Sequence, residues 1–461
     1  MSFSEMIASF DGWLWGLPLI IVLFGTHVYC TFRTGFIQKH TFKGIKLSVT
    51  ADKDAEGDVS QFGALTTALA ATIGTGNIVG VATAIANGGP GAVFWMWITG
   101  VFGIATKYME TAMSVRYREK TKDGRMIGGA MFALERGMGS KALGILFAFL
   151  AAIAAFGIGC LTQANSIATA LEQNFNVSPY IAGIIVAAFV AVVIIGGVKS
   201  ITRVTEKLIP FMAIFYILGC IFLMIRNGHY TGEAIGLIVK SAFSTQAAAG
   251  GFVGYAVRTA VRYGFARGLF SNESGMGSAP IVAASAQTRN PVRQSLVSMT
   301  GTFWDTVIIC ALSGITMVSS VLASDQVSLE NGNVITFQAF SLIPVVGKPI
   351  ITIALAMFAY STILGWAYYG ERAAEYLCGP KIMPFYKAIF VILAFVGCVS
   401  ELDTIWNIAD ILNGLMVIPN VIGIFALSKY LIADYKKYIN DIDAVDDTPI
   451  PVLTRTSVFG K

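Results

Sequence analysis

The chain has 461 residues, of which 55% are hydrophobic and 13% charged, and its mean hydropathy is +0.69. So apolar a composition excludes an ordinary water-soluble globular protein. The net charge of +5 is modest, and we expect no nucleic-acid partner. We therefore predict an all-α integral membrane protein, embedded in the lipid bilayer.

Apolar runs of about 20 residues, long enough to cross a bilayer as helices, recur along the chain with short loops between them. The first run lacks a preceding basic region and a cleavage site, so we interpret it as a retained helix and not as a signal peptide. We predict about eleven membrane-spanning helices, near residues 13–32, 62–86, 91–115, 142–172, 179–198, 205–226, 252–286 (interrupted), 294–320, 347–378, 384–400 and 404–431.

Lysine and arginine gather in particular loops and orient these helices. The basic residues are Arg33, Lys39, Lys43, Lys46 and Lys53 in the first loop, Arg116, Arg118, Lys120, Lys122, Arg125 and Arg136 in the third, and then Arg289, Arg293, Lys436 and Lys437. All of them fall on one side by alternation, which is cytoplasmic by the positive-inside rule. We expect a multi-pass protein of the cell membrane with its N-terminus outside and its C-terminus in the cytoplasm.

Two expected spans are broken by clusters of glycine and polar residues. The second contains "TIGTGNIVG" at 72–80, and the seventh contains "FSNESGMGS" at 270–278. Unwound backbone at membrane depth survives only where protein buries it or where it lines a water-filled site. Either cluster alone fits a helix-packing contact equally well, but the two occupy corresponding positions five spans apart. The seventh span also carries Arg258, Arg262 and Arg267, which indicate a water-facing stripe or a gate.

Two units of five spans, each beginning with a broken helix, must lie in opposite orientations, since five is odd. Such a 5+5 inverted repeat with two discontinuous helices is typical of secondary transporters. We divide the chain into an extra N-terminal transmembrane helix with its cytoplasmic loop (1–61), a first repeat (62–227), a second, inverted repeat (228–434) and a cytoplasmic C-terminal tail (435–461).

This layout predicts a binding chemistry. Free N–H groups at the start of a half-helix can hold a carboxylate, and freed carbonyls can coordinate a sodium ion. A channel is disfavoured because rings of carbonyls or charges are not evident. We expect no enzyme, because hydrolase and nucleotide-binding motifs are missing from the sequence and only His27, His40 and His229 are histidines.

The segments "GTGNIVGVATAIANGGPGAVFWMW" (74–97) and "RGLFSNESGMGSAPIVAASA" (267–286) resemble the alanine or glycine:cation symporter family, the sodium:alanine symporters, and the resemblance extends over nearly the whole chain. It implies the fold of the bacterial leucine transporter, import of alanine and glycine, and coupling to Na+. By position, the resemblance places a sodium site at Ala70, Ile73, Phe358, Ser361 and Thr362. The alternative for both hydroxyls is a bond back to the preceding helical turn.

For the substrate, we expect the amides of Gly74, Thr75 and Gly76 at its carboxylate, and the carbonyls of Phe270 and Ser271 at its ammonium group. Asn77 either contacts substrate or a second cation, or caps the inner half-helix. Gln163 is either a ligand or, like Asn165, an interhelical contact, and Trp366 either limits side-chain size or only packs. The remaining expected pocket residues are Ser274, Met276 and Gly277.

Carboxylates within the spans leave a proton-coupled amino-acid transporter as the alternative. The candidates are Glu273, Asp305 and Asp410, where Glu273 has Arg267 as a possible structural partner. Glu110 and Glu371 lie near basic residues and are expected to be structural. We expect a monomer that carries L-alanine and glycine, and we leave transport of D-alanine open.

Overall fold

The computed structural model describes residues 2–52, 55–244, 257–329, 332–401, 403–454 and 457–458. Lys53 and the first part of the expected seventh span, 252–256, lie outside this set. The rest is almost entirely helical. The helical elements are α1 (Phe3–Leu14), α2 (Leu17–Arg33), η1 (Ile37–His40), α3 (Thr41–Ser48), α4 (Gln61–Thr72), η2 (Gly76–Gly80), α5 (Val81–Gly88), α6 (Gly91–Arg116), α7 (Ala130–Phe132), η3 (Ala133–Gly137), α8 (Lys141–Phe156), η4 (Gly157–Leu161), α9 (Thr162–Phe175), α10 (Pro179–Ile195), α11 (Gly197–Asn227), α12 (His229–Phe243), α13 (Val257–Asn272), α14 (Pro280–Ala283), α15 (Pro291–Thr302), η5 (Phe303–Cys310), α16 (Ala311–Ala323), α17 (Gly332–Ser341), α18 (Gly347–Cys378), η6 (Pro380–Ile382), α19 (Met383–Val399) and α20 (Asp403–Tyr438).

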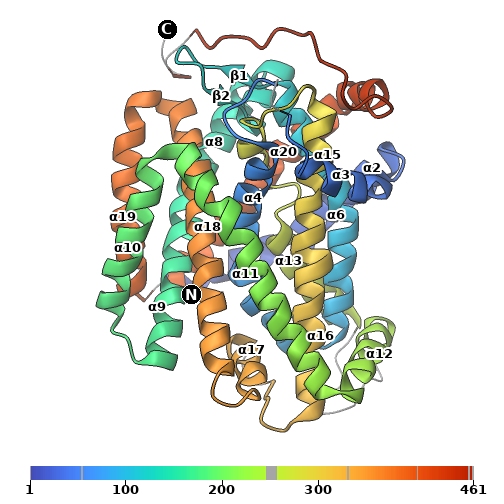
Figure 1. The fold of residues 1–461 in the computed structure, drawn as a ribbon, viewed down its shortest axis with the longest axis vertical. Coiled ribbons are helices and arrows are strands. Elements are labelled where there is room, and N and C mark those ends of the chain that lie inside the picture. Colours follow the sequence, from blue (N-terminus) through green and yellow to red (C-terminus); the bar gives the residue numbers. More distant parts are fainter. Residues whose placement is uncertain are drawn as a thin grey trace.

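The long helices form a bundle, with α10 and α19 side by side at one edge and a short hairpin of β1 (Glu119–Lys120) and β2 (Met126–Ile127) near the C-terminal tail (Figure 1). Among the described residues, four elements are π-helical: η2, η3, η4 and η5. Such wide turns are frequent at functional sites. Here η2, η4 and η5 each contribute to the centre of the bundle.

Each expected span coincides with a helix or with consecutive helices. Seven helical stretches within the described residues are long and apolar enough to cross a membrane, and α4 with η2–α5, bent by 52°, makes an eighth. α6 and α13 do not meet that standard, and α10 is shorter, so the number of eleven crossings and the repeat boundaries remain predictions. Helix α1 was not expected. It begins at Phe3 and exposes Phe3, Met6, Phe10 and Trp13, which follow helical spacing along one face.

Helix α13 packs tightly against α6 through two glycines. A Cβ at Gly264 would overlap the carbonyl oxygen of Ala92, and a Cβ at Gly268 would overlap Thr99 Oγ1. Small residues four apart allow helix backbones to approach closely where no hydrophobic effect drives association. The two helices are therefore in direct backbone contact over about one turn.

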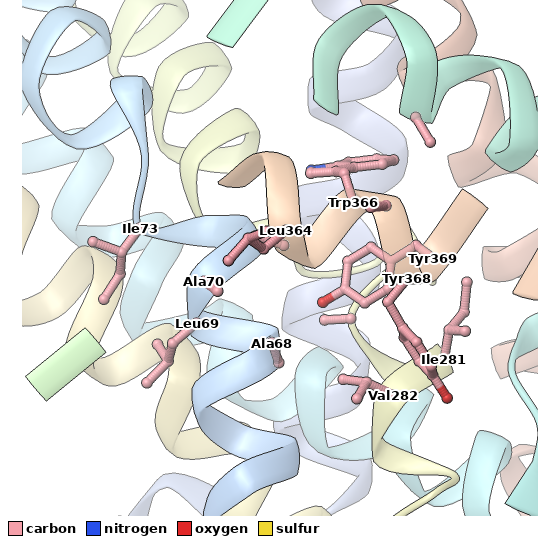
Figure 2. Close-up of a cluster of buried hydrophobic side chains, with 14 of the residues drawn as sticks. Ala68, Leu69, Ala70, Ile73, Ile281, Val282, Leu364, Trp366, Tyr368 and Tyr369 are labelled. Atoms are coloured by element: carbon pink, nitrogen blue, oxygen red, sulfur yellow. The ribbon is translucent and has the colours of Figure 1, made fainter. Parts of the chain in front are cut away.

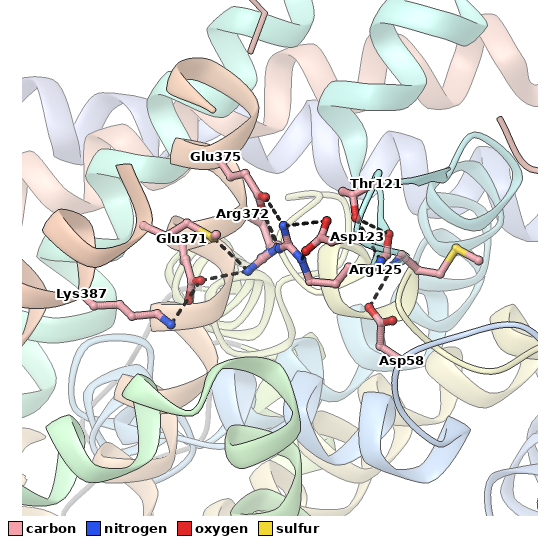
Figure 3. A network of polar contacts seen from close by, with 10 residues as sticks. Asp58, Thr121, Asp123, Arg125, Glu371, Arg372, Glu375 and Lys387 are labelled. Carbon is pink, nitrogen blue, oxygen red and sulfur yellow. Dashed lines mark hydrogen bonds and ion pairs between the residues drawn. The ribbon is translucent and has the colours of Figure 1, made fainter. Parts of the chain in front are cut away.

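Charged residues at one end of the bundle form a network between separate elements (Figure 3). Arg125, after β1, pairs with Glu375 of α18 at 2.9 Å and with Asp123 at 2.6 Å, and the hydrogen bond from Arg125 lowers the pKa of Asp123 to about 2. Asp58, just before α4, accepts from the amide of Met126 at 2.9 Å, while burial raises the pKa of Asp58. The network ties the entrance of α4 to the end of α18.

The C-terminal tail crosses the same end. Lys120 of β1 donates its amide to Pro451 at 2.9 Å and accepts from the amide of Leu453 at 2.8 Å, so the tail extends the hairpin like a strand. Farther along, the amide of Val458 donates to the carbonyl of Tyr376 at 3.0 Å. All four loops expected to be cytoplasmic thus meet at one end of the molecule, while the direction in which that end faces stays a prediction.

Candidate functional site

The first break lies between α4 and η2. Ser60 precedes α4 and its hydroxyl caps the amide of Gly63 at 2.8 Å, and the helix ends at Thr72. Ile73 is extended (φ −75°, ψ 92°), and the chain becomes helical again from Thr75. A Cβ at Gly74 would overlap Thr362 Oγ1. Only glycine therefore lets α18 approach the unwound backbone this closely.

The second break follows α13 and is held by a carboxylate from α6. Glu273, Gly275 and Gly277 have φ of 51°, 91° and 78°, a left-handed region that favours glycine. Glu110 accepts from the amides of Gly275 and Gly277 at 3.0 and 3.1 Å. Lys107 pairs with Glu110 at 3.0 Å and donates to the carbonyl of Glu273 at 3.1 Å. The N–H groups of this break are thus already bound to an anion of the protein itself.

The two breaks meet at a small cavity of about 20 Å³, enough for roughly one water molecule. A Cβ at Gly76 would lie only 3.5 Å from Ser271, at the end of α13. The cavity is lined by Ala71, Thr72, Gly74, Thr75, Gly76, Ile158, Gln163, Phe270, Ser271, Glu273, Thr362, Trp366 and Asn413.

Seven of the expected substrate residues line this cavity: Gly74, Thr75, Gly76, Gln163, Phe270, Ser271 and Trp366. Four others are placed elsewhere. Ser274 bonds to Thr302 at 2.9 Å, Met276 packs in an apolar cluster, Gly277 donates to Glu110, and Asn77 lies behind the first break. Asn165 makes the interhelical contacts expected as its alternative, to the carbonyls of Gly397 and Ser400.

Two buried polar atoms of the cavity wall have no hydrogen-bond partner among the described residues. Gln163 Oε1 and Asn413 Oδ1 are both buried and accept no hydrogen bond within the described structure. Asn413 was missed from the sequence, although a lone amide in the apolar stretch "ILNGLM" of α20 was the available signal. Glu273 accepts from Trp366 Nε1 at 3.2 Å and from Ser278 Oγ at 2.6 Å, and Arg267, which we named as a possible partner, is not among its partners.

The expected sodium ligands converge between α4 and α18. Ser361 Oγ lies 3.5 Å from the carbonyl oxygen of Ile73 and 2.8 Å from that of Phe358, and Thr362 Oγ1 lies 3.0 Å from the Phe358 oxygen. Ala70 is buried on α4, in the apolar cluster that also contains Leu364 (Figure 2). Both hydroxyls donate to the carbonyl of Phe358 in the preceding helical turn, which is the alternative arrangement that we described for them. The donor set consists of oxygens, which a hard cation such as sodium prefers.

Behind the first break, Asp305 of η5 forms a second polar centre. It accepts from Asn77 Nδ2 at 2.7 Å, Ser271 Oγ at 3.0 Å and Thr306 Oγ1 at 2.6 Å. Asn77 Oδ1 in turn accepts from the amide of Gly74 at 2.9 Å. This centre links both breaks through hydrogen bonds, and Asp305 makes no ion pair with another described residue.

Comparison with known proteins identifies the family. The family model described as "Sodium:alanine symporter family" matches residues 1–450. The chain belongs to this family. As a family member it is a secondary transporter of the membrane that couples amino-acid transport to sodium, and it is not an enzyme.

Individual relatives agree with this assignment. The sodium/alanine symporter AgcS of Methanococcus maripaludis is 46% identical over 95% of this chain and 98% of its own length. The putative sodium/proton-dependent alanine carrier protein YrbD of Bacillus subtilis is 35% identical over 94% and 92%. The crystal structure of MhsT in complex with L-phenylalanine matches with a TM-score of 0.55 at 15% identity, covering 82% of this chain and 99% of that one, which shows a shared fold.

Proposed function

We propose that this symporter imports alanine and glycine together with Na+ by alternating access, with the substrate held between the two helix breaks. The observation that supports the proposal is the cavity lined both by residues of the first break and by two side chains with unpartnered oxygens. Its wall offers one place for a carboxylate and another for an ammonium group.

The carboxylate belongs at the first break. Thr75 and Gly76 begin the inner helical segment, and the first N–H groups of a helix have no acceptor within it. The corresponding amides of the second break, from Gly275 and Gly277, already bind Glu110. We therefore place the substrate carboxylate at the amides of Thr75 and Gly76.

The ammonium group belongs at the acceptor oxygens of the cavity wall. Gln163 Oε1 and Asn413 Oδ1 are acceptors without donors, and a buried acceptor left unpaired costs about 1–3 kcal/mol. The last carbonyls of α13, around Phe270 and Ser271, add acceptors at the end of the helix that carries partial negative charge. A substrate –NH3+ satisfies three such oxygens at once.

The size of the cavity favours a very small side chain. Trp366 and Ile158 form apolar parts of the wall, and Trp366 is fixed by its hydrogen bond to Glu273. Gly159 of η4 allows the Trp366 side chain to come this close, since a Cβ there would overlap it. Because the cavity as it stands holds about one water molecule, its wall must recede for any amino acid, and it recedes least for a methyl or hydrogen side chain.

Sodium would bind at the carbonyl oxygens of Ala70, Ile73 and Phe358 and at the hydroxyls of Ser361 and Thr362. On binding, the two hydroxyls rotate from donating to Phe358 to presenting lone pairs. Because one ligand comes from the unwound end of α4, the ion stabilises the geometry that also binds the carboxylate. Sodium and substrate must then raise each other's affinity equally.

The test is alanine uptake into proteoliposomes at zero membrane potential, with an inward sodium gradient or an inward proton gradient applied separately. We expect concentrative uptake with the sodium gradient, and competition by glycine. Uptake driven by protons alone would overturn the sodium site. Absence of uptake under both gradients would overturn the cargo.

A second candidate, proton coupling, is favoured by Asp305. A buried carboxylate without a cationic partner is costly unless a proton or a cation joins it. If Asp305 carries a proton, Asp305→Asn abolishes uptake that depends on a proton gradient and spares any uptake that sodium drives alone. Equal loss under both gradients would contradict a specific proton role.

A further inference from the structure

A second cavity, of about 190 Å³, lies next to the central one. It is enclosed by α1, α13 and α20, and Phe270 lines both cavities, so this side chain separates them. The residues that argue for a function are Asp11, Trp15, Arg262, Arg267, Phe270 and Asp410. Asp11 lies in α1, Trp15 directly follows it and Asp410 lies in α20, so these three are outside the two helix breaks.

This cavity is bordered by two acidic and two basic side chains that form no ion pairs with one another. Asp11 Oδ1 and Asp410 Oδ1 are buried and accept no hydrogen bond from a described residue. Arg267 is the cation whose charge acts on both carboxylates, yet it forms no hydrogen bond or ion pair with another described residue. Arg262 donates to the carbonyl of Gly12 at 3.4 Å and lies over the ring of Tyr263, 5.6 Å from its centroid, and it forms no ion pair with a described carboxylate. Two carboxylates and two guanidinium groups thus border one cavity without neutralising each other directly.

Aromatic contacts fix the geometry of the cavity. Trp15 Nε1 donates to the backbone carbonyl of Asp410 at 3.0 Å, which fastens the end of α1 to α20. The Trp15 ring meets Phe270 edge to face at 5.8 Å. α1 therefore completes both the polar wall and the aromatic partition toward the central cavity.

We propose that this cavity binds a zwitterionic amino acid before it passes Phe270, and that α1 completes this staging site. The carboxylate is held by Arg267 and Arg262, and the ammonium group by the free oxygens of Asp11 and Asp410. The site carries no net charge, so a simple anion or amine would satisfy one pair and leave the other uncompensated. That the ligand is an amino acid rests on the function proposed above.

The test uses the full chain with Ala266→Cys, a position on the cavity wall, in a Cys378→Ser background, because Cys378 is the exposed cysteine. The rate of labelling by a methanethiosulfonate reagent is measured with each amino acid, with ethylamine and with propionate. We expect amino acids to slow labelling, and ethylamine and propionate at equal concentration to leave it unchanged. Equal protection by propionate or ethylamine would overturn the zwitterion site.

Substitutions of charged residues test whether the protecting amino acid binds in this cavity. Arg267→Gln and Asp410→Asn should each weaken it by about ten-fold or more, the factor expected when a charged hydrogen bond is lost. Arg258→Gln is the matched control, since Arg258 lies on the same helix and does not line this cavity. Equal effects of Arg258→Gln and Arg267→Gln would overturn the proposal.

Alanine uptake, measured together with the labelling, distinguishes a failure of the staging site from a failure of the proposed function. If alanine is transported and no amino acid protects position 266, the staging site is wrong and the function stands. If some other amino acid protects and alanine is not transported, the cargo is wrong and the staging site stands.

Discussion

Ser361 and Thr362 are the adjacent hydroxyl residues of α18 that we propose as sodium ligands. Both lie beside the unwound end of α4, whereas Thr352 on the same helix only donates to Lys348 at 2.8 Å. At the scale of residues, the position of a hydroxyl relative to Ile73 therefore matters more than its presence.

Ser361→Ala should raise the sodium concentration for half-maximal uptake by about ten-fold, which corresponds to about 1.4 kcal/mol of lost ion binding. The measurement is alanine uptake at graded sodium concentrations in proteoliposomes. Thr352→Ala removes a hydroxyl with a similar backbone bond and should leave the sodium dependence unchanged. The same shift in both variants would argue for a folding effect.

Trp366 combines bulk with a hydrogen bond, and two substitutions separate these properties. Trp366→Ala should let valine and leucine compete with alanine uptake, because the apolar wall recedes. Trp366→Phe keeps most of the bulk and loses only the bond to Glu273, so it should preserve the preference for small substrates. Unchanged competition in Trp366→Ala would show that other residues limit size.

At the scale of elements, α6 supports the second break through one carboxylate. Glu110 is buried and accepts from two amides of the break and from Asn420 Nδ2 at 3.1 Å. The sequence suggested only that Glu110 is structural, because apart from Lys107 its partners Gly275, Gly277 and Asn420 lie more than 160 residues away.

Glu110→Gln should destabilise the fold by about 3 kcal/mol, since it leaves Lys107 buried without its anion. Thermal unfolding in detergent measures this loss, and alanine uptake should fall with it. Glu56→Gln is a control at an exposed pair, with Lys120, where the cost should stay below about 1 kcal/mol. Equal unfolding temperatures for the two variants would contradict the support that we assign to Glu110.

Helix positions followed from the sequence because a membrane helix must be a long apolar run, whatever its neighbours are. The two breaks were predictable for a related reason. Clusters of glycine and polar residues at membrane depth indicate unwound backbone, which must be buried in protein or line a water-filled site. The π-helical turns were not predictable: η5 turns Asp305 toward Asn77 and Ser271, and that orientation depends on packing between distant helices.

At the scale of the whole molecule, the C-terminal tail joins parts that are far apart in sequence. The sequence showed only a polar tail of mixed charge. Its pairing with Lys120 is set by backbone hydrogen bonds, which leave little trace in side-chain pattern.

Deleting residues 446–461 should therefore expose the amide of Lys120 to rapid hydrogen exchange and lower the unfolding temperature. The amide of Thr121, which donates to Arg125 within the hairpin, should keep its protection. Deleting only residues 459–461 is the matched control and should change neither quantity. Unaltered exchange at Lys120 in the longer deletion would show that the tail is not attached there in the membrane.

The glycine contact between α13 and α6 has a further consequence. Gly264 and Gly268 bring the two backbones together, and Lys107 and Glu110 join them again at the second break. Both contacts prevent α6 and α13 from sliding along each other. A pair of spin labels on the outer faces of α6 and α13 should thus report a single distance throughout the transport cycle, and these two helices can serve as the fixed frame against which the displacement of α18 is measured.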